Sequence, residues 1–288
     1  MALLLRFSAF PFVAIVAMTV MLSCAGCSER FTDPSTSTAP IASAVAAETR
    51  PETDAGKGKG YTFQIVYPAL APDWKPLDEA IRHFAAAQKK EFLGESSASD
   101  RDSGVDYTLD LNFAVARRTA DFVSVMASGS SFIGGAHGMP ILASFNLDLA
   151  TGKLTPLPEL FADAQAGLNA LSAECRRQLE GRYEAKVRES PGAMTPAQQA
   201  SDIQFMKRWI EKGTAPDAAN FGVFLIDGLD TRAIGVTVIF PPYKVASYAD
   251  GPQQVEVPAK VFYDLLKPEY KDAFAIDTEA AKLGAGVR

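Results

Sequence analysis

The chain has 288 residues, of which 48% are hydrophobic and 22% charged. This composition excludes a wholly disordered protein and supplies enough apolar surface for one large or two small folded domains. The formal net charge of −6 excludes a generally basic surface of the kind that binds nucleic acid, and makes a basic partner easier to accommodate.

The N-terminus combines a basic residue with a long apolar run. Arg6 precedes the apolar segment 7–22, and small residues with two cysteines follow at once. This order predicts a secretory signal peptide over residues 1–26. An uncleaved membrane anchor is the less favoured alternative, because Pro11 interrupts the run and a spanning helix needs about 20 apolar residues.

The segment Cys24–Cys27 resembles a lipobox, the motif at which a diacylglycerol is attached to a cysteine before cleavage. Two small residues precede Cys27 as the pattern requires, although Cys24 stands where a large aliphatic residue is expected. If Cys24 were the lipidated residue, the bulky Leu22 would occupy a position that needs a small one. We therefore expect the lipid on Cys27. Ser28 then resembles the sorting signal of lipoproteins that face the periplasm from the outer membrane.

Removal of the signal peptide and acylation of Cys27 would leave Cys175 as the one free thiol of the mature chain. Cys175 shares a predicted helical stripe with Leu168, Leu171 and Leu179. The pattern indicates a buried thiol that packs as a small apolar group, rather than a catalytic or metal-binding cysteine.

Residues 27–59 are rich in small and polar types without periodicity, which predicts a flexible tether. The folded part is expected to begin with a strand at 61–67 that ends at Pro68. Pro76 can occupy a first helical turn, and apolar residues then recur at spacings of three and four as far as Phe92. This helix is expected to cover a sheet.

Alternating apolar and polar residues predict strands at 107–115, 122–126 and 141–149, and their short connections favour antiparallel pairing. The second region is expected to contain two helices, two strands and a final helix. The helices are predicted at 164–186 and 197–211, the strands at 221–226 and 234–240 around a hairpin turn at 227–230, and the last helix at 259–266.

Helices and strands thus occur in blocks, which predicts an α+β fold of two packed subdomains, each with an antiparallel sheet covered by helices. The first subdomain is expected at 60–154 and the second at 155–275. A polar tail at 276–288 finishes the chain.

The first candidate binding segment is the glycine-rich run that contains Gly134, Gly135 and His137. Glycines permit a positive φ and a close backbone approach, and a histidine can donate, accept or ligate. The alternative is a demanding turn whose histidine is held by backbone hydrogen bonds, since glycine clusters often punctuate strands.

The second candidate binding segment follows the strand at 234–240. Adjacent prolines stiffen its backbone, two tyrosines offer amphipathic contact surface, and an Asp-Gly pair forms a turn. The residues are Pro241, Pro242, Tyr243, Tyr248, Asp250 and Gly251. Such a segment suits recognition, and it equally suits a structural cover over the end of the sheet.

Motifs for catalysis are sparse. With two histidines in the chain, a zinc site built from repeated histidine ligands is not expected, and neither is a cofactor. A Ser-His-Asp arrangement can be drawn, but no nucleophile-elbow motif supports it. It would combine Ser130 or Ser131 with His137 and either Asp148 or Asp250.

Together the segments resemble the paired extracellular domains of unknown function in RsiV-type anti-sigma factors and PdaC-type polysaccharide deacetylases. The matching residues are Gly134–His137, the run Asn146–Phe161 with its Thr151-Gly152-Lys153 turn, and Phe240–Tyr243 continued by Tyr248–Gly251. The likeness extends over residues 61–266. It implies a PdaC-like first subdomain, an RsiV-type second one, and a ligand-binding or sensing role in the cell envelope.

The anti-sigma members of this group bind lysozyme, so the resemblance implies lysozyme or another basic protein as one partner, and peptidoglycan fragments as another. The apolar run begins almost at Met1, so we expect no anti-sigma activity. We also expect no deacetylase domain. The favoured prediction is a non-enzymatic envelope lipoprotein. The alternatives are a wall-directed hydrolase that uses His137 as its base and a purely structural envelope protein.

Overall fold

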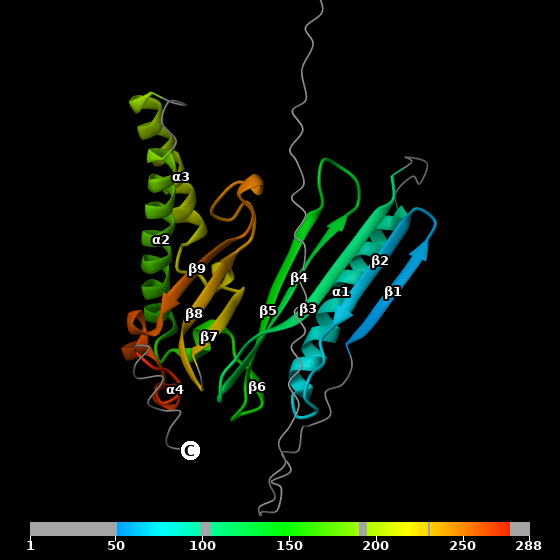
Figure 1. Ribbon diagram of the computed structural model, residues 1–288, viewed down its shortest axis with the longest axis horizontal. Coiled ribbons are helices and arrows are strands. Elements are labelled where there is room, and N and C mark those ends of the chain that lie inside the picture. Colours follow the sequence, from blue (N-terminus) through cyan, green and yellow to red (C-terminus); the bar gives the residue numbers. More distant parts are fainter. Residues whose placement is uncertain (1–50, 99–104, 190–194, 230, 277–288) are drawn as a thin grey trace, which may run out of the picture. The chain divides into compact units, whose positions relative to one another are not determined.

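The computed structural model describes residues 51–98, 105–189, 195–229 and 231–276 (Figure 1). The predicted signal peptide, Cys24 and Cys27 lie outside these ranges, as do most of the predicted tether and the polar tail after Ile276. Within the described ranges, no helix is long and apolar enough to cross a membrane.

The first sheet has the strand order β1-β2-β3-β4-β5-β6 (Figure 1). The strands are β1 (Glu52–Gly58), β2 (Tyr61–Tyr67), β3 (Tyr107–Arg118), β4 (Phe122–Phe132), β5 (Met139–Asp148) and β6 (Lys153–Leu154). Helix α1 (Lys75–Ala98) connects β2 to β3, and these two strands run parallel while the others pair antiparallel. The parallel pairing of β2 with β3 follows from their connection, because a helical crossover rather than a short turn joins them.

Strand β1 occupies residues that the sequence assigns to the tether. It pairs with β2 along its whole length, from Glu52 opposite Tyr67 to Gly58 opposite Tyr61. Side chains of α1 also reach it, since Lys89 donates to Asp54 at 2.8 Å. Small and polar residues can form an exposed edge strand without apolar alternation, so the periodicity of the sequence could not reveal this strand.

One face of the first sheet packs on α1. Leu77, Ile81 and Phe92 of the helix are buried, as the spacing predicts. They belong to a core with apolar residues of the central strands, among them Leu109, Leu111, Phe113, Val123 and Val125. His83 lies on the exposed side of α1, as expected.

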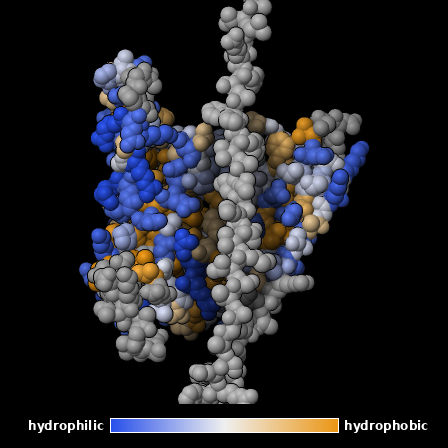
Figure 2. Space-filling view, viewed as in Figure 1, coloured by the Kyte–Doolittle hydropathy of each residue, from blue (hydrophilic) through white to orange (hydrophobic). Residues whose placement is uncertain are grey.

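The second sheet has the antiparallel order β7-β8-β9, with β7 (Phe224–Leu229), β8 (Arg232–Phe240) and β9 (Gln253–Pro258). Helices α2 (Ala164–Arg188) and α3 (Pro196–Gly213) lie beside this sheet (Figure 1). Figure 2 shows a hydrophilic surface along these helices. The Thr195 side chain and Gln198 form a capping box at the start of α3. The predicted turn at 227–230 lies within β7 as far as Leu229, because a bulge at Gly228 prolongs the ladder.

The predicted helix at 259–266 is wrong. Two 3₁₀ helices, η4 (Ala259–Val261) and η5 (Tyr263–Leu265), replace it, and the short helix α4 (Pro268–Lys271) follows. Ala259, Phe262 and Leu266 are all buried. Their spacing of three and four residues imitates a helical stripe, while each side chain enters the core from a separate short turn.

The core of the second region lies between α2 and the small sheet, and Cys175 is part of it. The Cys175 side chain is fully buried, as the sequence predicts, and burial raises the pKa of its thiol to about 12. A thiol with so high a pKa is almost entirely protonated at neutral pH. Cys175 therefore packs as an apolar group.

Polar side chains of the large sheet join the two sheets by capping the free edge of β7. The Phe224 amide donates to the Ser144 hydroxyl at 2.8 Å, and the Ile226 amide donates to the Ser124 hydroxyl at 3.1 Å. The Asn146 amide group donates to the Phe224 carbonyl at 3.0 Å. These bonds satisfy backbone groups that an edge strand leaves without a ladder partner.

Candidate functional site

The structure brings the two candidate segments together, although more than 100 residues separate them in sequence. The His137 ring, in the β4–β5 loop, stacks on the Tyr248 ring, in the β8–β9 loop, with centroids 3.8 Å apart and planes 20° apart. Tyr243 completes the group, because its hydroxyl lies 3.3 Å from Nε2 of His137. We call His137, Tyr243 and Tyr248 the aromatic cluster.

Hydrogen bonds to the backbone fix the two stacked rings. The Tyr248 hydroxyl donates to the Gly138 carbonyl at 2.9 Å, and Nδ1 of His137 lies 3.1 Å from the same oxygen. Gly134 and Gly135 have φ values of 98° and 101°, which a residue with a Cβ rarely adopts. The glycines therefore allow the sharp turn that carries His137 to the second loop.

Tyr243 has an unusual backbone conformation for a tyrosine, with a φ of 68°. A bulky residue in the left-handed region persists only where its surroundings hold it. Here the Trp209 indole donates to the Tyr243 carbonyl at 3.1 Å, and the Tyr243 amide donates to the Ala246 carbonyl at 3.0 Å. The Tyr243 side chain is 51% exposed. The loop thus presents an aromatic ring to solvent at the cost of backbone strain.

The remaining predicted residues shape or anchor the second loop. Asp250 accepts from Lys186 of α2 at 2.7 Å and from the Ser247 hydroxyl at 2.6 Å, and these bonds hold its pKa below the usual range. Gly251 has a φ of 66° directly after it. Pro241 and Pro242 are half-buried at the end of β8. Asp250 therefore ties the loop to α2 and lies outside the aromatic cluster.

The Ser-His-Asp arrangement drawn from the sequence is not assembled. Asp148 is 3% exposed, and its Oδ1 accepts from the backbone amides of Ala150 and Thr151, so it shapes a turn. Asp250 is engaged by Lys186 and Ser247. Within the described ranges, His137 contacts aromatic rings and a carbonyl rather than a carboxylate.

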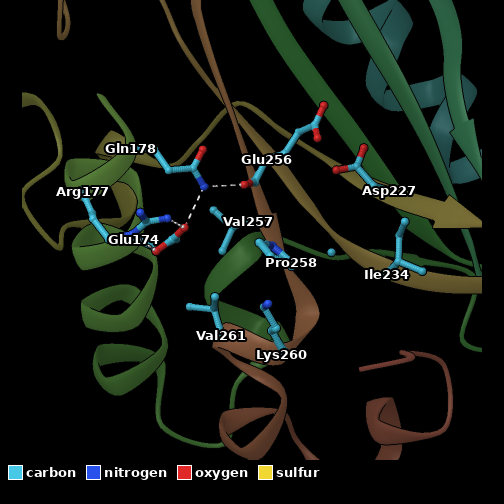
Figure 3. A pocket seen from close by; sticks show the side chains of 11 residues that line it. Glu174, Arg177, Gln178, Asp227, Ile234, Glu256, Val257, Pro258, Lys260 and Val261 are labelled. Carbon is cyan, nitrogen blue, oxygen red and sulfur yellow. Dashed lines mark hydrogen bonds and ion pairs between the residues drawn. The ribbon is translucent and has the colours of Figure 1, made fainter. Parts of the chain in front are cut away.

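A cavity of about 560 Å³ lies near the other end of the small sheet (Figure 3). Residues of α2, η4 and all three strands of the small sheet line it, including Glu174, Arg177, Asp227, Glu256 and Lys260. This cavity is not predictable from the sequence pattern, because β9 is an edge strand that the pattern does not indicate. No cluster of three or more His, Cys, Asp or Glu that could hold a metal occurs in the part of the chain that the structure describes.

Residues 158–260 match the sequence model of a family described as "Protein of unknown function (DUF3298)". The chain carries a DUF3298-like domain. That domain includes α2, α3, the small sheet and the loop with Tyr243 and Tyr248, whereas His137 precedes it. The aromatic cluster therefore joins the DUF3298-like domain to the sheet before it.

Known proteins extend the likeness beyond the DUF3298-like domain. The chain is 22% identical over 216 residues to the peptidoglycan-N-acetylmuramic acid deacetylase PdaC of Bacillus subtilis (strain 168). The match covers 75% of this chain and 41% of PdaC, so the chain spans about two fifths of that protein. The resemblance to PdaC-type proteins is thereby confirmed in this coarse form, and the pairing with an RsiV-type domain stays a prediction.

The fold itself is shared with a solved structure. A crystal structure of a DUF3298 family protein from Pseudomonas aeruginosa PAO1 superposes with a TM-score of 0.53 at 17% identity, and covers 77% of this chain and 96% of that one. A DUF3298 family member from Bacteroides fragilis NCTC 9343 gives a TM-score of 0.49 at 14% identity, with coverages of 78% and 96%. The first of these confirms the predicted combination of helices with two largely antiparallel sheets.

Proposed function

We propose that this protein binds a glycan of the bacterial cell wall, without catalysis, through the aromatic cluster. The observation that carries the proposal is the exposed Tyr243 ring beside the stacked rings of His137 and Tyr248. A sugar ring offers an apolar face of C–H groups that packs on aromatic rings, and its hydroxyls can bond to the polar tips of tyrosine and histidine. The likeness to a protein named as a peptidoglycan deacetylase supports the choice of a wall glycan.

A glycan suits the aromatic cluster better than a basic protein such as lysozyme does. Its three members carry no carboxylate, and the nearby Asp250 is already paired with Lys186. The net charge of −6 would still steer a basic protein toward the chain as a whole. Lysozyme is therefore the second ligand to test.

The proposal includes the location that the N-terminal sequence predicts. A lipid on Cys27 would attach the protein to a membrane of the cell envelope, with the folded part in the periplasm and the outer membrane as the expected site. The support is the signal-like segment 1–26 and the lipobox-like segment Cys24–Cys27. Mass spectrometry of the protein purified from cells would detect the diacylglycerol on Cys27 and its loss in a Cys27→Ser variant.

Calorimetric titration of the full chain in detergent tests the binding. We expect saturable binding of N-acetylglucosamine tetramers or peptide-free wall glycan, and about tenfold weaker binding for His137→Ala or Tyr248→Leu, because central contact residues typically contribute 1–2 kcal/mol or more. His83→Ala is the matched control, since His83 is exposed on α1.

Two results would contradict the glycan proposal. One is the absence of heat with either glycan while the protein is folded by circular dichroism. The other is saturable binding that these substitutions leave unchanged. Binding of lysozyme alone, weakened by His137→Ala, would replace the glycan with a basic protein partner.

A further inference from the structure

We propose that the cavity beside β9 is a second binding site, and that it takes a short zwitterionic peptide with apolar side chains. Its volume of about 560 Å³ falls within the range of 300–1,000 Å³ that is typical of small-ligand sites. Ile234, Val257, Pro258 and Val261 supply apolar lining. The site is independent of the aromatic cluster, which lies on loops that leave the opposite ends of β8 and β9.

Two carboxylates form one end of the cavity. Asp227 is opposite Gly235 and Glu256 is opposite Thr237, so both side chains project from the same face of the small sheet. Figure 3 shows the two carboxylates on the same side of the cavity. Asp227 is already held by Arg117 at 3.0 Å and by the Thr237 hydroxyl at 2.6 Å. Glu256 makes no ion pair within the described ranges, which leaves its carboxylate to accept an ammonium group.

The side chains of α2 that line the cavity bond to one another, which holds them in place and pairs their opposite charges. Arg177 donates to both carboxylate oxygens of Glu174, at 2.6 and 2.8 Å, and Gln178 also donates to Glu174 at 2.8 Å. These bonds lower the pKa of Glu174, whose side chain is 15% exposed. Gln178 further donates to the backbone carbonyl of Glu256 at 2.8 Å, which attaches α2 to β9. These side chains position β9 and have little charge left for a ligand.

Lys260 supplies the opposite charge. Its charge helps to lower the pKa of Glu174, but its ammonium makes no hydrogen bond or ion pair with the part of the chain that the structure describes. Figure 3 shows Pro258 between Lys260 and the Glu256 carboxylate. The cavity thus presents an anion, an apolar stretch and a cation in that order. A short peptide matches this order with its amino group, its apolar side chains and its terminal carboxylate.

A phosphorylated ligand or a sugar would fit the lining of the cavity less well than a short peptide. A phosphorylated ligand would meet three carboxylates, on Glu174, Asp227 and Glu256, against two basic side chains, one of which is already paired. A sugar would find no aromatic ring among the residues that line the cavity. The balance of charge and apolar surface therefore favours a peptide.

Tri-alanine is the probe, titrated by calorimetry into the full chain in detergent beside N-acetyl-tri-alanine and tri-alanine amide. We expect saturable binding of tri-alanine, and a two- to fivefold loss of affinity for Glu256→Gln and for Lys260→Met, as for partly exposed ion pairs. Acetylation should weaken binding to the wild type but not further in Glu256→Gln. Amidation should weaken binding to the wild type but should not weaken it further in Lys260→Met.

Glu269→Gln and Lys153→Met are matched controls, since both residues are exposed and neither lines the cavity. The proposal is overturned if tri-alanine gives no saturable heat at millimolar concentration. It is equally overturned if the controls weaken binding as much as the cavity variants, or if the capped peptides bind as tightly as the free one. Loss of glycan binding in His137→Ala concerns the aromatic cluster alone. Either proposal can therefore fail while the other stands.

Discussion

At the scale of single residues, the structure depends on a buried amide that no apolar pattern predicts. Asn146 is 3% exposed, and it accepts from the Ser124 hydroxyl at 2.6 Å while it donates to the Phe224 carbonyl at 3.0 Å. It therefore links a strand of the large sheet to the edge strand of the small sheet. A buried polar group of this kind is stabilising only while all of its partners remain.

Asn146→Ala should lower the free energy of unfolding by about 1–3 kcal/mol, because the Phe224 carbonyl would lose its partner in a buried position. Urea denaturation at neutral pH measures the effect. Asn112→Ala, on the exposed side of β3, is the control and should change stability by less than about 0.5 kcal/mol. Equal effects for the two variants would show that the link between the sheets contributes nothing.

At the scale of elements, the packing requires a glycine at one helical position and not at another. A Cβ at Gly213, the last residue of α3, would lie 2.1 Å from the Lys244 carbonyl oxygen and 2.6 Å from Cγ1 of Val245. Gly213 therefore lets α3 approach the backbone of the loop that carries Tyr243. Gly181 in α2 has no atom within 4 Å of the corresponding position, so nothing near it requires a glycine.

Gly181→Ala should raise the free energy of unfolding by about 0.5–1 kcal/mol, since alanine restricts the unfolded chain and the helix accepts its methyl group. Gly213→Ala should lower it by about 1–3 kcal/mol through overpacking against the loop. Thermal and urea unfolding of the two variants compare the effects. A stable Gly213→Ala variant with unchanged glycan affinity would contradict the proposed support of the loop by α3.

Apolar periodicity predicts most elements of the fold. Strand β2 and helices α2 and α3 occur within a few residues of their expected bounds, because each presents one apolar face to a core. Helix α1 begins where expected and continues past Phe92 to Ala98. Strand β1 and strand β9 were not predicted. Both are edge strands with many exposed positions, so their pairing depends on distant residues rather than on a local pattern.

The candidate site is predictable only in part. Glycines beside His137 and paired prolines before Tyr243 indicate two special loops, but contact between the loops depends on how the β4–β5 and β8–β9 connections meet in space. The role of Asp250 was not predictable either, since its partner Lys186 is 64 residues away. The cavity beside β9 is lined by residues of α2, β7, β8, β9 and η4, and β9 and η4 were absent from the predicted fold.

At the scale of the whole molecule, two separate cores are joined by the contacts of β7 with the large sheet. One core contains Trp74 with residues of α1 and the large sheet, and the other lies between α2 and the small sheet. Besides the Asn146 link, Arg117 bonds to Asp227, and the Ala120 amide donates to the Thr231 carbonyl at 2.8 Å. These contacts predict that the cores unfold together.

The two tryptophans of the chain report on the two regions separately, because Trp74 belongs to the first core and Trp209 lies on α3 beside the Tyr243 loop. In Trp209→Phe, fluorescence follows the first core, and in Trp74→Phe it follows α3 of the second region. We expect the fluorescence midpoint in urea to coincide with the circular dichroism midpoint in each variant, as for a two-state transition. Two distinct midpoints would instead mean that the subdomains unfold independently.

The two histidines of the chain allow a direct test of whether a wall glycan contacts the aromatic cluster. His137 belongs to the cluster, whereas His83 lies on the exposed side of α1 and serves as an internal reference. The measurement is the NMR chemical shift of both imidazole rings during titration with N-acetylglucosamine tetramers. We predict a saturable shift of the His137 resonances with those of His83 unchanged; no shift of His137 at saturating glycan would contradict the account.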